Sequence, residues 1–353
     1  MNKLIDNYIL HAAATIVIAI TPLVATAQTA TPRPPEKPGV KTSYPPYPPA
    51  PISKPDPYPR PDPNPRDNSE RSIKVDPSVN LLLSCVREGT VKVNGWNRNE
   101  VRVLISDGSR FAFSTLQKNT KTGEPEWIKI VNAESRNRYG TNSECIAGSE
   151  IHVDAPMNAT VTIKGYDINT TVDTVDKLEV AVTGGDVSVR NVASGVTVSA
   201  GRGDVTVDSS KGAMNLETTT GNILVFQGGP SKVGDEFRAK TNNGAIALQS
   251  LEYRRMVVGS ISGSVAYTGE IQNSGSYSMS TTRGSIRLAI PVKSSFQIWA
   301  TYGFGTFHSD LPIDIATENI TPGPLKTLRG KLGTNDATLK LTASNGSILI
   351  KKM

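Results

Sequence analysis

Residues 196–225 read VTVSAGRGDVTVDSSKGAMNLETTTGNILV. The stretch holds two copies of one template: an apolar pair separated by one residue, six further residues, and a second apolar pair with the same spacing. In both copies glycine stands two residues before the second pair, at Gly203 and Gly221. A short unit that returns at a regular interval predicts a repeat architecture, because one such unit cannot bury its own apolar face.

The template recurs through most of the second half of the chain. Clear copies pair Leu178 and Val180 with Val187 and Val189, Val196 and Val198 with Val205 and Val207, Met214 and Leu216 with Ile223 and Val225, Phe237 and Ala239 with Ile246 and Leu248, Met256 and Val258 with Val265 and Tyr267, Tyr277 and Met279 with Ile286 and Leu288, and Leu339 and Leu341 with Ile348 and Ile350. Weaker copies are Val161, Ile163, Thr170, Val172 and Phe296, Ile298, Gly305, Phe307. Successive glycines at 185, 203, 221, 244, 263 and 284 are 18, 18, 23, 19 and 21 residues apart. The unit is therefore about 20 residues long.

Alternation of apolar and polar residues makes each apolar pair a strand with one buried face. Two all-β architectures fit this pattern. One is a β-solenoid of stacked coils, and the other is a chain of hairpins with tight turns at residues 242–244 (NNG) and 344–346 (SNG). The two connections of a unit, residues 189–196 and 198–205, are similarly turn-like and similar in length. This similarity favours the β-solenoid, with glycine at a tightly bent corner.

The N-terminus is typical of an export signal. Lys3 is followed by an apolar core of 13 residues, Ala12 to Val24, and by the small-residue site Ala25-Thr26-Ala27. We therefore predict a signal peptide over residues 1–27, with Gln28 as the first mature residue. The alternative is an uncleaved anchor over residues 9–24. No other segment is apolar enough to cross a membrane.

A proline-rich arm is predicted over residues 28–71, since 15 of the 24 prolines lie between residues 32 and 65. Proline removes backbone donors, so this arm cannot join a sheet. It is either a disordered tail or an extended spacer of roughly 100 Å, and an uncleaved anchor would tether that spacer. The β-solenoid domain is predicted over residues 72–353. Irregular excursions are expected near residues 106–145, hairpin-like, and 308–336, and residues 336–352 are expected to supply the closing unit.

Cys85 and Cys145 are the two cysteines of the chain. In an oxidising compartment they can form a disulfide, which would stabilise the fold by about 4 kcal/mol in the chain-entropy model. The alternative is two buried thiols. Export and the position of both residues near predicted strand ends favour the disulfide.

The charge balance gives little reason to expect a nucleic-acid partner. The formal net charge is +6, and the basic residues are scattered, with Arg254-Arg255 and Lys351-Lys352 as the longest clusters. Aromatic residues make up 6% of the chain. The densest aromatic patch, residues 302–307 (YGFGTF), is expected to plug the end of the solenoid or to stack on a sugar or peptide.

The best candidate for a site is a polar ladder at the residue after each corner glycine. These residues are Asp186, Asp204, Asn222, Ala245, Ser264 and Ser285. In a solenoid they would stack on one outer edge, with Asp186 and Asp204 about 5 Å apart. Such a pair could hold Ca²⁺ or act in a retaining glycosidase, but a solvated polar edge is the preferred interpretation.

We assign no catalytic, cofactor-binding or metal-binding residue from the sequence. His152 and His308 lack the spacing of a histidine metal site, and no G-x-S-x-G elbow occurs. The tripeptide Arg202-Gly203-Asp204 matches an integrin-binding motif, yet its glycine is simply the corner glycine of one repeat. We treat that match as a coincidence.

Three stretches resemble the DUF4097 family of exported, adhesin-type proteins with β-strand repeats. They are residues 89–101 (GTVKVNGWNRNEV), the run of T-x-x-G-x-I/V-x-V units, and the C-terminal stretch from residues 307–312 (FHSDLP) to 344–350 (SNGSILI). The resemblance covers residues 72–353. It implies a right-handed β-helix-like fold in a bacterial envelope or secreted protein, with no established catalytic residues. The proline-rich arm and the cysteine pair are not part of it.

Together these patterns predict an exported, non-enzymatic β-solenoid that is periplasmic, surface-bound or secreted. It would act in adhesion, binding or scaffolding against a glycan or protein surface, through ladders of Ser, Thr, Asn and Asp. The alternative is a carbohydrate-active β-helix enzyme, a polysaccharide lyase or hydrolase. That enzyme would need Asp186 and Asp204 to flank a deep cleft together with Arg190 or Arg202.

Overall fold

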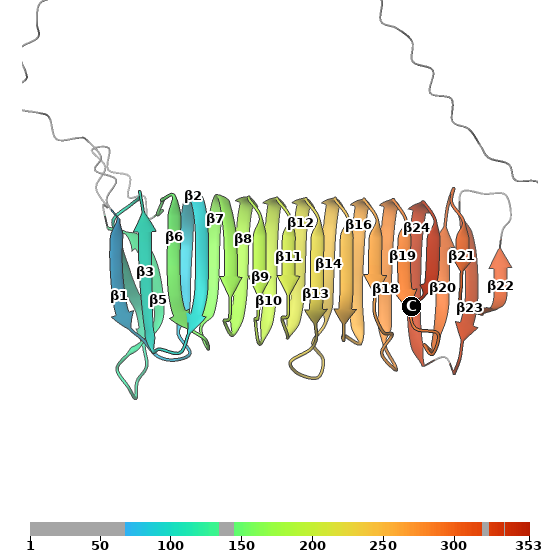
Figure 1. Ribbon diagram of the computed structural model, residues 1–353, viewed down its shortest axis with the longest axis horizontal. Coiled ribbons are helices and arrows are strands. Elements are labelled where there is room, and N and C mark those ends of the chain that lie inside the picture. Colours follow the sequence, from blue (N-terminus) through green and yellow to red (C-terminus); the bar gives the residue numbers. More distant parts are fainter. Residues whose placement is uncertain (1–67, 134–144, 320–324, 335) are drawn as a thin grey trace, which may run out of the picture. The chain divides into compact units, whose positions relative to one another are not determined.

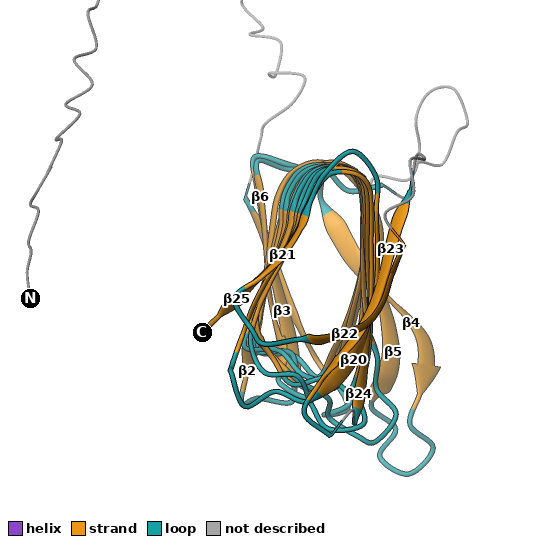
Figure 2. Cartoon of the chain, turned by 90° about the vertical axis from the view of Figure 1, so that its right-hand side faces the viewer, coloured by secondary structure: helices purple, strands orange, loops and turns teal. Residues whose placement is uncertain are grey.

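The computed structural model describes residues 68–133, 145–319, 325–334 and 336–353. Within these residues every regular element is a β-strand, and the strands form one continuous sheet that folds into two facing layers (Figures 1 and 2). The predicted signal peptide and residues 28–67 of the predicted arm lie outside the described residues. The first strand, β1 (Ser69–Lys74), begins shortly before the predicted domain start at residue 72.

The N-terminal strands build both layers at once. They are β1, β2 (Asn80–Trp96), β3 (Glu100–Ser106), β4 (Phe111–Lys118), β5 (Pro125–Asn132), β6 (Glu150–Pro156) and β7 (Thr160–Asp173). β2 and β7 are long because each bends around a corner, so that its first half pairs in one layer and its second half in the other. β4 and β5 pair antiparallel inside the predicted excursion at residues 106–145.

Each central coil contributes one strand to each layer, which we call face A and face B. Face A holds β8 (Lys177–Gly184), β10 (Gly195–Arg202), β12 (Ala213–Thr220), β14 (Phe237–Asn243), β16 (Arg255–Ser262) and β18 (Ser276–Arg283). Face B holds β9 (Val187–Arg190), β11 (Val205–Asp208), β13 (Ile223–Gly228), β15 (Ile246–Leu251), β17 (Val265–Thr268) and β19 (Ile286–Ile290). Corresponding strands of successive coils pair in parallel and in register. The predicted β-solenoid is thereby confirmed, and the hairpin alternative is wrong because a hairpin would pair its two strands antiparallel.

The core is the apolar template itself. On face A, Val196 lies between Leu178 and Met214 in the neighbouring coils. All three side chains are buried, as are the corresponding residues of face B. Fully burying one such side chain is worth about 1.5–3 kcal/mol, and no single coil could gain this without its neighbours. The stacking of apolar side chains on the apolar side chains of the neighbouring coils therefore stabilises the fold.

Wider loops connect face B back to face A, and three tyrosines fill them. Tyr253, Tyr267 and Tyr277 are almost completely buried. Their hydroxyls donate to backbone carbonyls, Tyr253 to Gly212 at 2.7 Å and Tyr277 to Tyr253 at 3.0 Å. Burial raises the pKa of the Tyr253 and Tyr267 hydroxyls above the ordinary tyrosine value. These phenols satisfy carbonyls that would otherwise be stranded in the core.

The C-terminal strands are stacked out of sequence order. They are β20 (Phe296–Tyr302), β21 (Phe307–Ser309), β22 (Asp314–Asn319), β23 (Lys326–Leu332), β24 (Ala337–Asn345) and β25 (Ile348–Lys352). β24 pairs with β18 on one side and β20 on the other, and β25 lies between β19 and β21 (Figure 1). The expectation that residues 336–352 close the stack is wrong, because this coil is inserted inside it. β20 and β21 lie beyond it, and β22 and β23 form an antiparallel extension of face A.

Candidate functional site

The corner between face A and face B is a column of glycines. Six of them, at the positions that the sequence pattern singled out, have a positive φ between 101° and 159°. A Cβ on Gly203 would lie closer than 3.0 Å to the backbone oxygen of Gly185, and one on Gly221 would meet the oxygen of Gly203 in the same way. Each coil therefore needs glycine here, both for its own backbone and for the approach of the next coil.

The predicted ladder residues follow this column, and their side chains bind backbone. Asp186 Oδ1 accepts the N–H of Asp204 at 2.8 Å, and Asp204 Oδ1 accepts the N–H of Asn222 at 2.7 Å. Asn222 Oδ1 accepts the N–H of Ala245 at 2.9 Å. One coil earlier, Asn169 Oδ1 accepts the N–H of Asp186 at 2.9 Å. Side-chain oxygens thus link successive coils from Asn169 to Ala245, where the ladder is interrupted because alanine has no side-chain oxygen. Further along, Ser264 Oγ accepts the N–H of Ser285 at 3.4 Å.

A second column explains the threonine of the T-x-x-G pattern. In four coils a buried hydroxyl, three residues before the corner glycine, donates to the corner carbonyl of the preceding coil. These bonds run from Thr218 to Gly203 at 3.2 Å, Thr241 to Gly221 at 2.9 Å, Ser260 to Gly244 at 2.9 Å, and Thr281 to Gly263 at 2.7 Å. A hydrogen bond offsets the cost of burying a hydroxyl, so these bonds explain why Ser or Thr occupies this position.

The two arginines that the enzyme alternative places beside the ladder pair with other carboxylates. Arg202 lies 3.4 Å from Asp167, and Arg190 lies 2.8 Å from Asp173, so each guanidinium pairs with a carboxylate outside the ladder. Among the described residues, no group of three or more His, Cys, Asp or Glu side chains is placed to hold a metal ion. The geometry of the ladder is that of a coil-to-coil brace.

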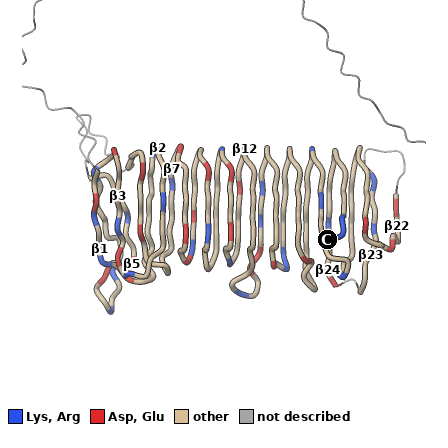
Figure 3. Tube along the Cα trace, in the orientation of Figure 1, with Lys and Arg blue, Asp and Glu red and all other residues tan. Residues whose placement is uncertain are grey.

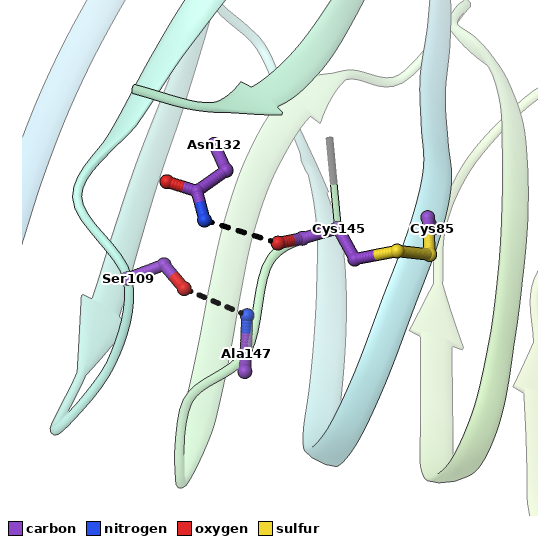
Figure 4. The surroundings of a disulfide bond; sticks show 5 residues. All are labelled: Cys85, Ser109, Asn132, Cys145 and Ala147. Carbon is purple, nitrogen blue, oxygen red and sulfur yellow. Dashed lines mark hydrogen bonds between the residues drawn. A yellow bond between two sulfur atoms is a disulfide. The ribbon is translucent and has the colours of Figure 1, made fainter. Parts of the chain in front are cut away.

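The predicted disulfide is present in the structure. Cys85 on β2 is bonded to Cys145, and their Cα atoms are 4.5 Å apart (Figure 4). The backbone around the bond is paired as well, because the Ile146 N–H donates to the Cys85 carbonyl at 3.0 Å. The Asn132 side chain donates to the Cys145 carbonyl at 3.2 Å (Figure 4). The bond ties the N-terminal excursion to the first coil.

An aromatic and charged cluster lies on the outer side of face B, where β2, β3 and β6 meet. The guanidinium groups of Arg98 and Arg102 lie 4.9 Å and 5.3 Å from the centre of the Trp96 ring. Arg102 Nε and Nη2 donate to Asp154 Oδ2 at 2.9 Å and 2.7 Å, and this bond and charge raise the pKa of the arginine. His152 Nε2 lies 3.2 Å from Asp154 Oδ1. The cluster cross-links three strands, and it pairs His152 with a carboxylate two residues along the same face of β6.

His308 and the aromatic stretch at residues 302–307, which the sequence also singles out, lie at the C-terminal end of the stack. His308 lies on β21 at the far end of the stack, where its Nε2 is 3.1 Å from Asp310. Within the aromatic stretch, Tyr302 is buried and contacts Phe307 with ring centres 6.3 Å apart, whereas Phe304 is exposed. This stretch therefore fills part of the C-terminal end, next to the inserted coil.

A depression lies on the outer side of face A. Its volume is about 330 Å³, and it spans β12, β14, β16 and β18. The outward residues around it are Asn215, Glu217, Arg238, Lys240, Val257, Gly259, Ile261, Ser280 and Thr282. We call it the Gly259 depression. Acidic and basic residues are interspersed along the stack, with no band of one sign (Figure 3).

The repeat pattern does not single out Gly259, because the glycines that recur at a regular interval are those of the corners. Gly259 lies in the middle of a strand, between the inward residues Val258 and Ser260. The signal was available in the outward positions of the same strand, which read Val257, Gly259 and Ile261. Elsewhere on face A such positions are mostly hydroxyl, amide or charged residues, so this apolar trio stands out.

A two-layered β-solenoid of parallel coils defines a class of stacked-repeat proteins. A family model described as Toastrack DUF4097 matches residues 86–351. The chain belongs to this family, as the sequence resemblance implied. None of the curated proteins matches the chain.

Solved structures that are similar to this chain share little sequence with it. One, from Clostridium sporogenes ATCC 15579, is described as a "putative cell adhesion protein"; it is 13% identical, with 81% of this chain and 100% of that chain covered and a TM-score of 0.17. Two come from Parabacteroides distasonis ATCC 8503. The "putative adhesin" is 8% identical; the match covers 81% of this chain and 97% of that chain, with a TM-score of 0.33. The "putative lipid binding protein" is 13% identical; the match covers 83% of this chain and 98% of that chain, with a TM-score of 0.27.

Proposed function

We propose that this chain is an exported, non-enzymatic protein of the periplasm, cell surface or extracellular space, which acts in adhesion, binding or scaffolding by contact. The observation that carries the proposal is the outer wall of face A. Parallel strands in register place their outward residues in rows, for example Thr197, Asn215 and Arg238. These rows carry hydroxyl, amide and charged groups over successive coils. A broad wall of this kind suits a partner surface better than a small substrate.

Export is supported by two features of the chain. The Cys85–Cys145 bond is of the kind that persists in oxidising compartments. The N-terminal sequence is typical of a signal peptide, although it lies outside the described residues. Among the described residues, no helix has the length and hydrophobicity of a membrane span.

Contact, as opposed to turnover, is supported by how the ladder carboxylates are used. Asp186 and Asp204 hold backbone N–H groups of the next coil, so neither is poised as a nucleophile or acid beside a cleft. A partner with a glycan or protein surface fits the mixed charges of the stack (Figure 3). Nucleic acid fits less well, because a phosphate backbone is bound by clustered basic residues.

Binding of the full chain to an immobilised array of glycans and extracellular-matrix proteins tests this proposal. We expect saturable binding to at least one surface. Ser278→Arg, which adds a bulky charge to the outer side of face A, should weaken that binding, whereas Thr268→Arg on face B should not. Absence of binding to every surface would count against adhesion. An equal loss of binding in both variants would count against face A as the binding surface.

A further inference from the structure

Gly259 is a glycine that the fold does not require. It lies in β16 without a positive φ, and the strand pairs in unbroken register with both neighbours. A Cβ added there would meet one atom within 4 Å, the mobile Ser280 hydroxyl at 3.2 Å. The corner glycines differ, because a Cβ on any of them would strike backbone. Glycine inside a strand weakens it, and it often marks a place where a ligand approaches closely.

The missing side chain forms the floor of the Gly259 depression. Along the strand, Val257 and Ile261 flank the floor and are 39% and 45% exposed. Across the sheet, Lys240 and Ser280 lie in register with Gly259 on the two neighbouring strands. Val257 and Ile261 are four residues apart, so the hollow is about 13 Å long between their Cα atoms. A volume of about 330 Å³ falls within the range of small-molecule sites.

The rim presents both signs of charge and both kinds of hydrogen-bonding group. Glu217 offers acceptors and Lys240 offers donors, while Ser280 and Thr282 offer both. Arg238 donates to Glu236 at 2.8 Å, so much of its charge is neutralised beside the hollow. A simple anion would be repelled by Glu217, and a simple cation by Lys240. The rim therefore suits neutral groups that donate and accept, such as alcohols.

We propose that the Gly259 depression binds one pyranose ring of a neutral glycan. A pyranose has a C–H face, which would lie on Gly259 between Val257 and Ile261, and hydroxyls at its edge, which would reach Glu217 and Lys240. The apolar contact contributes through burial, and the hydroxyls would replace water as hydrogen-bond partners of Glu217 and Lys240. The proposal rests on the proposed binding function, because it names the ligand class of face A.

Two valine substitutions test the site. Gly259→Val fills the hollow with a residue that strands favour, so the fold should be kept. Ala181→Val is the matched control, because Ala181 occupies the same row of face A several coils away. Glu217→Gln removes a charged acceptor from the rim without changing the backbone. Circular dichroism and thermal unfolding should show that all three variants fold like the wild type.

The probe is an array of neutral oligosaccharides that end in hexose or N-acetylhexosamine, with uronate- and sialic-acid-terminated glycans and matrix proteins as separate arms. We expect the wild type and Ala181→Val to bind neutral glycans equally. Gly259→Val should weaken binding on the order of tenfold or more, and Glu217→Gln should weaken it as well.

Other outcomes overturn the inference. Undiminished glycan binding by Gly259→Val would place the ligand elsewhere, and binding confined to acidic glycans or proteins would reject the ligand class. In both cases the proposed binding function would stand. Absence of binding on every arm would reject both proposals together.

Discussion

At each corner between face A and face B, a few residues with distinct tasks hold the coil. In the central coils a hydroxyl such as that of Thr218 donates to the carbonyl of the coil before it. Glycine, here Gly221, allows the positive φ and the close approach of the next coil. The polar residue after it, Asn222, accepts the backbone N–H of Ala245 in the coil that follows. The corner thus satisfies its own buried polar groups, as a buried turn must.

The glycine column predicts a large penalty for one added methyl group. Gly203→Ala would place a Cβ against the Gly185 carbonyl at a φ of 127°. We expect a loss of about 3 kcal/mol or more in the free energy of unfolding, measured by urea denaturation. Gly259→Ala, in a strand with no such constraint, is the control and should be neutral or slightly stabilising. Equal stability of the two variants would contradict this account of the corner.

A single buried hydroxyl offers a stabilising change. Thr170 is 1% exposed, and its Oγ1 has no hydrogen-bond partner among the described residues. Its row on face B is otherwise apolar, with Val91 and Val187 as its neighbours. Thr170→Val should therefore raise the free energy of unfolding by about 1 kcal/mol, because it removes an unpaired polar group at equal volume. Thr171→Val, which changes the adjacent outward residue, should have no comparable effect, and a destabilised Thr170→Val would refute the argument.

Much of the corner could be predicted from the sequence, since period and glycine position depend only on the spacing of residues. The alignment of Asp186 with Asp204 follows from that period as well. The sequence could not show where the carboxylates point. Their bonds to backbone N–H groups depend on the stagger between coils, which is set in three dimensions.

Among the elements, the N-terminal excursion depends most on a covalent bond. Cys85 and Cys145 are 60 residues apart, and their bond joins β2 to the segment that leads into β6. In the chain-entropy model a loop of this length is worth about 4 kcal/mol. The double variant Cys85→Ala/Cys145→Ala should lose a stability of that order in denaturant unfolding.

Reductant provides the control for this prediction. The wild type should lose a similar amount of stability in dithiothreitol, and the double variant should not respond to it. A double variant as stable as the wild type would show that packing alone holds the excursion. The pairing itself was predictable, because an exported chain with two cysteines has one intramolecular choice.

At the scale of the whole molecule, the order of coils differs from the order of the sequence. β24 and β25, the last strands of the chain, lie between the coil of β18 and β19 and the coil of β20 and β21 (Figure 1). The interior of the C-terminal third therefore cannot be complete until the last residues are in place. The inserted residues Leu339 and Leu341 are fully buried there.

Removal of the inserted coil should disorder the coil beyond it. A chain that ends at Gly333 lacks β24 and β25, so β21 loses its partner and β20 keeps only its antiparallel pairing with β23. Limited proteolysis should therefore degrade residues 296–332 while β8 to β17 stay protected. A chain that lacks only Lys352 and Met353 is the control and should keep the protection of the wild type. Persistent protection of residues 296–332 in the shorter chain would mean that their order does not depend on β24 and β25.

The insertion could not be predicted from the sequence, because the last copy of the template is as regular as those before it. Leu339, Leu341, Ile348 and Ile350 fit any level of the stack equally well. What places them is the geometry of neighbouring coils, and local pattern carries no information about it. The outward residues of β16 mark the floor of the Gly259 depression in the sequence, but its walls belong to four strands together and depend on how the coils stack.

The most direct test of the central claim, that the outer wall acts by contact and not by turnover, is mass spectrometry of a bound glycan. The full chain is incubated for a prolonged period with an oligosaccharide that it binds on the array. The oligosaccharide is then recovered, and its molecular mass is measured. We predict saturable binding and a ligand of unchanged mass. Cleaved products, whether from hydrolysis or from elimination, would contradict the account and support a carbohydrate-active enzyme instead.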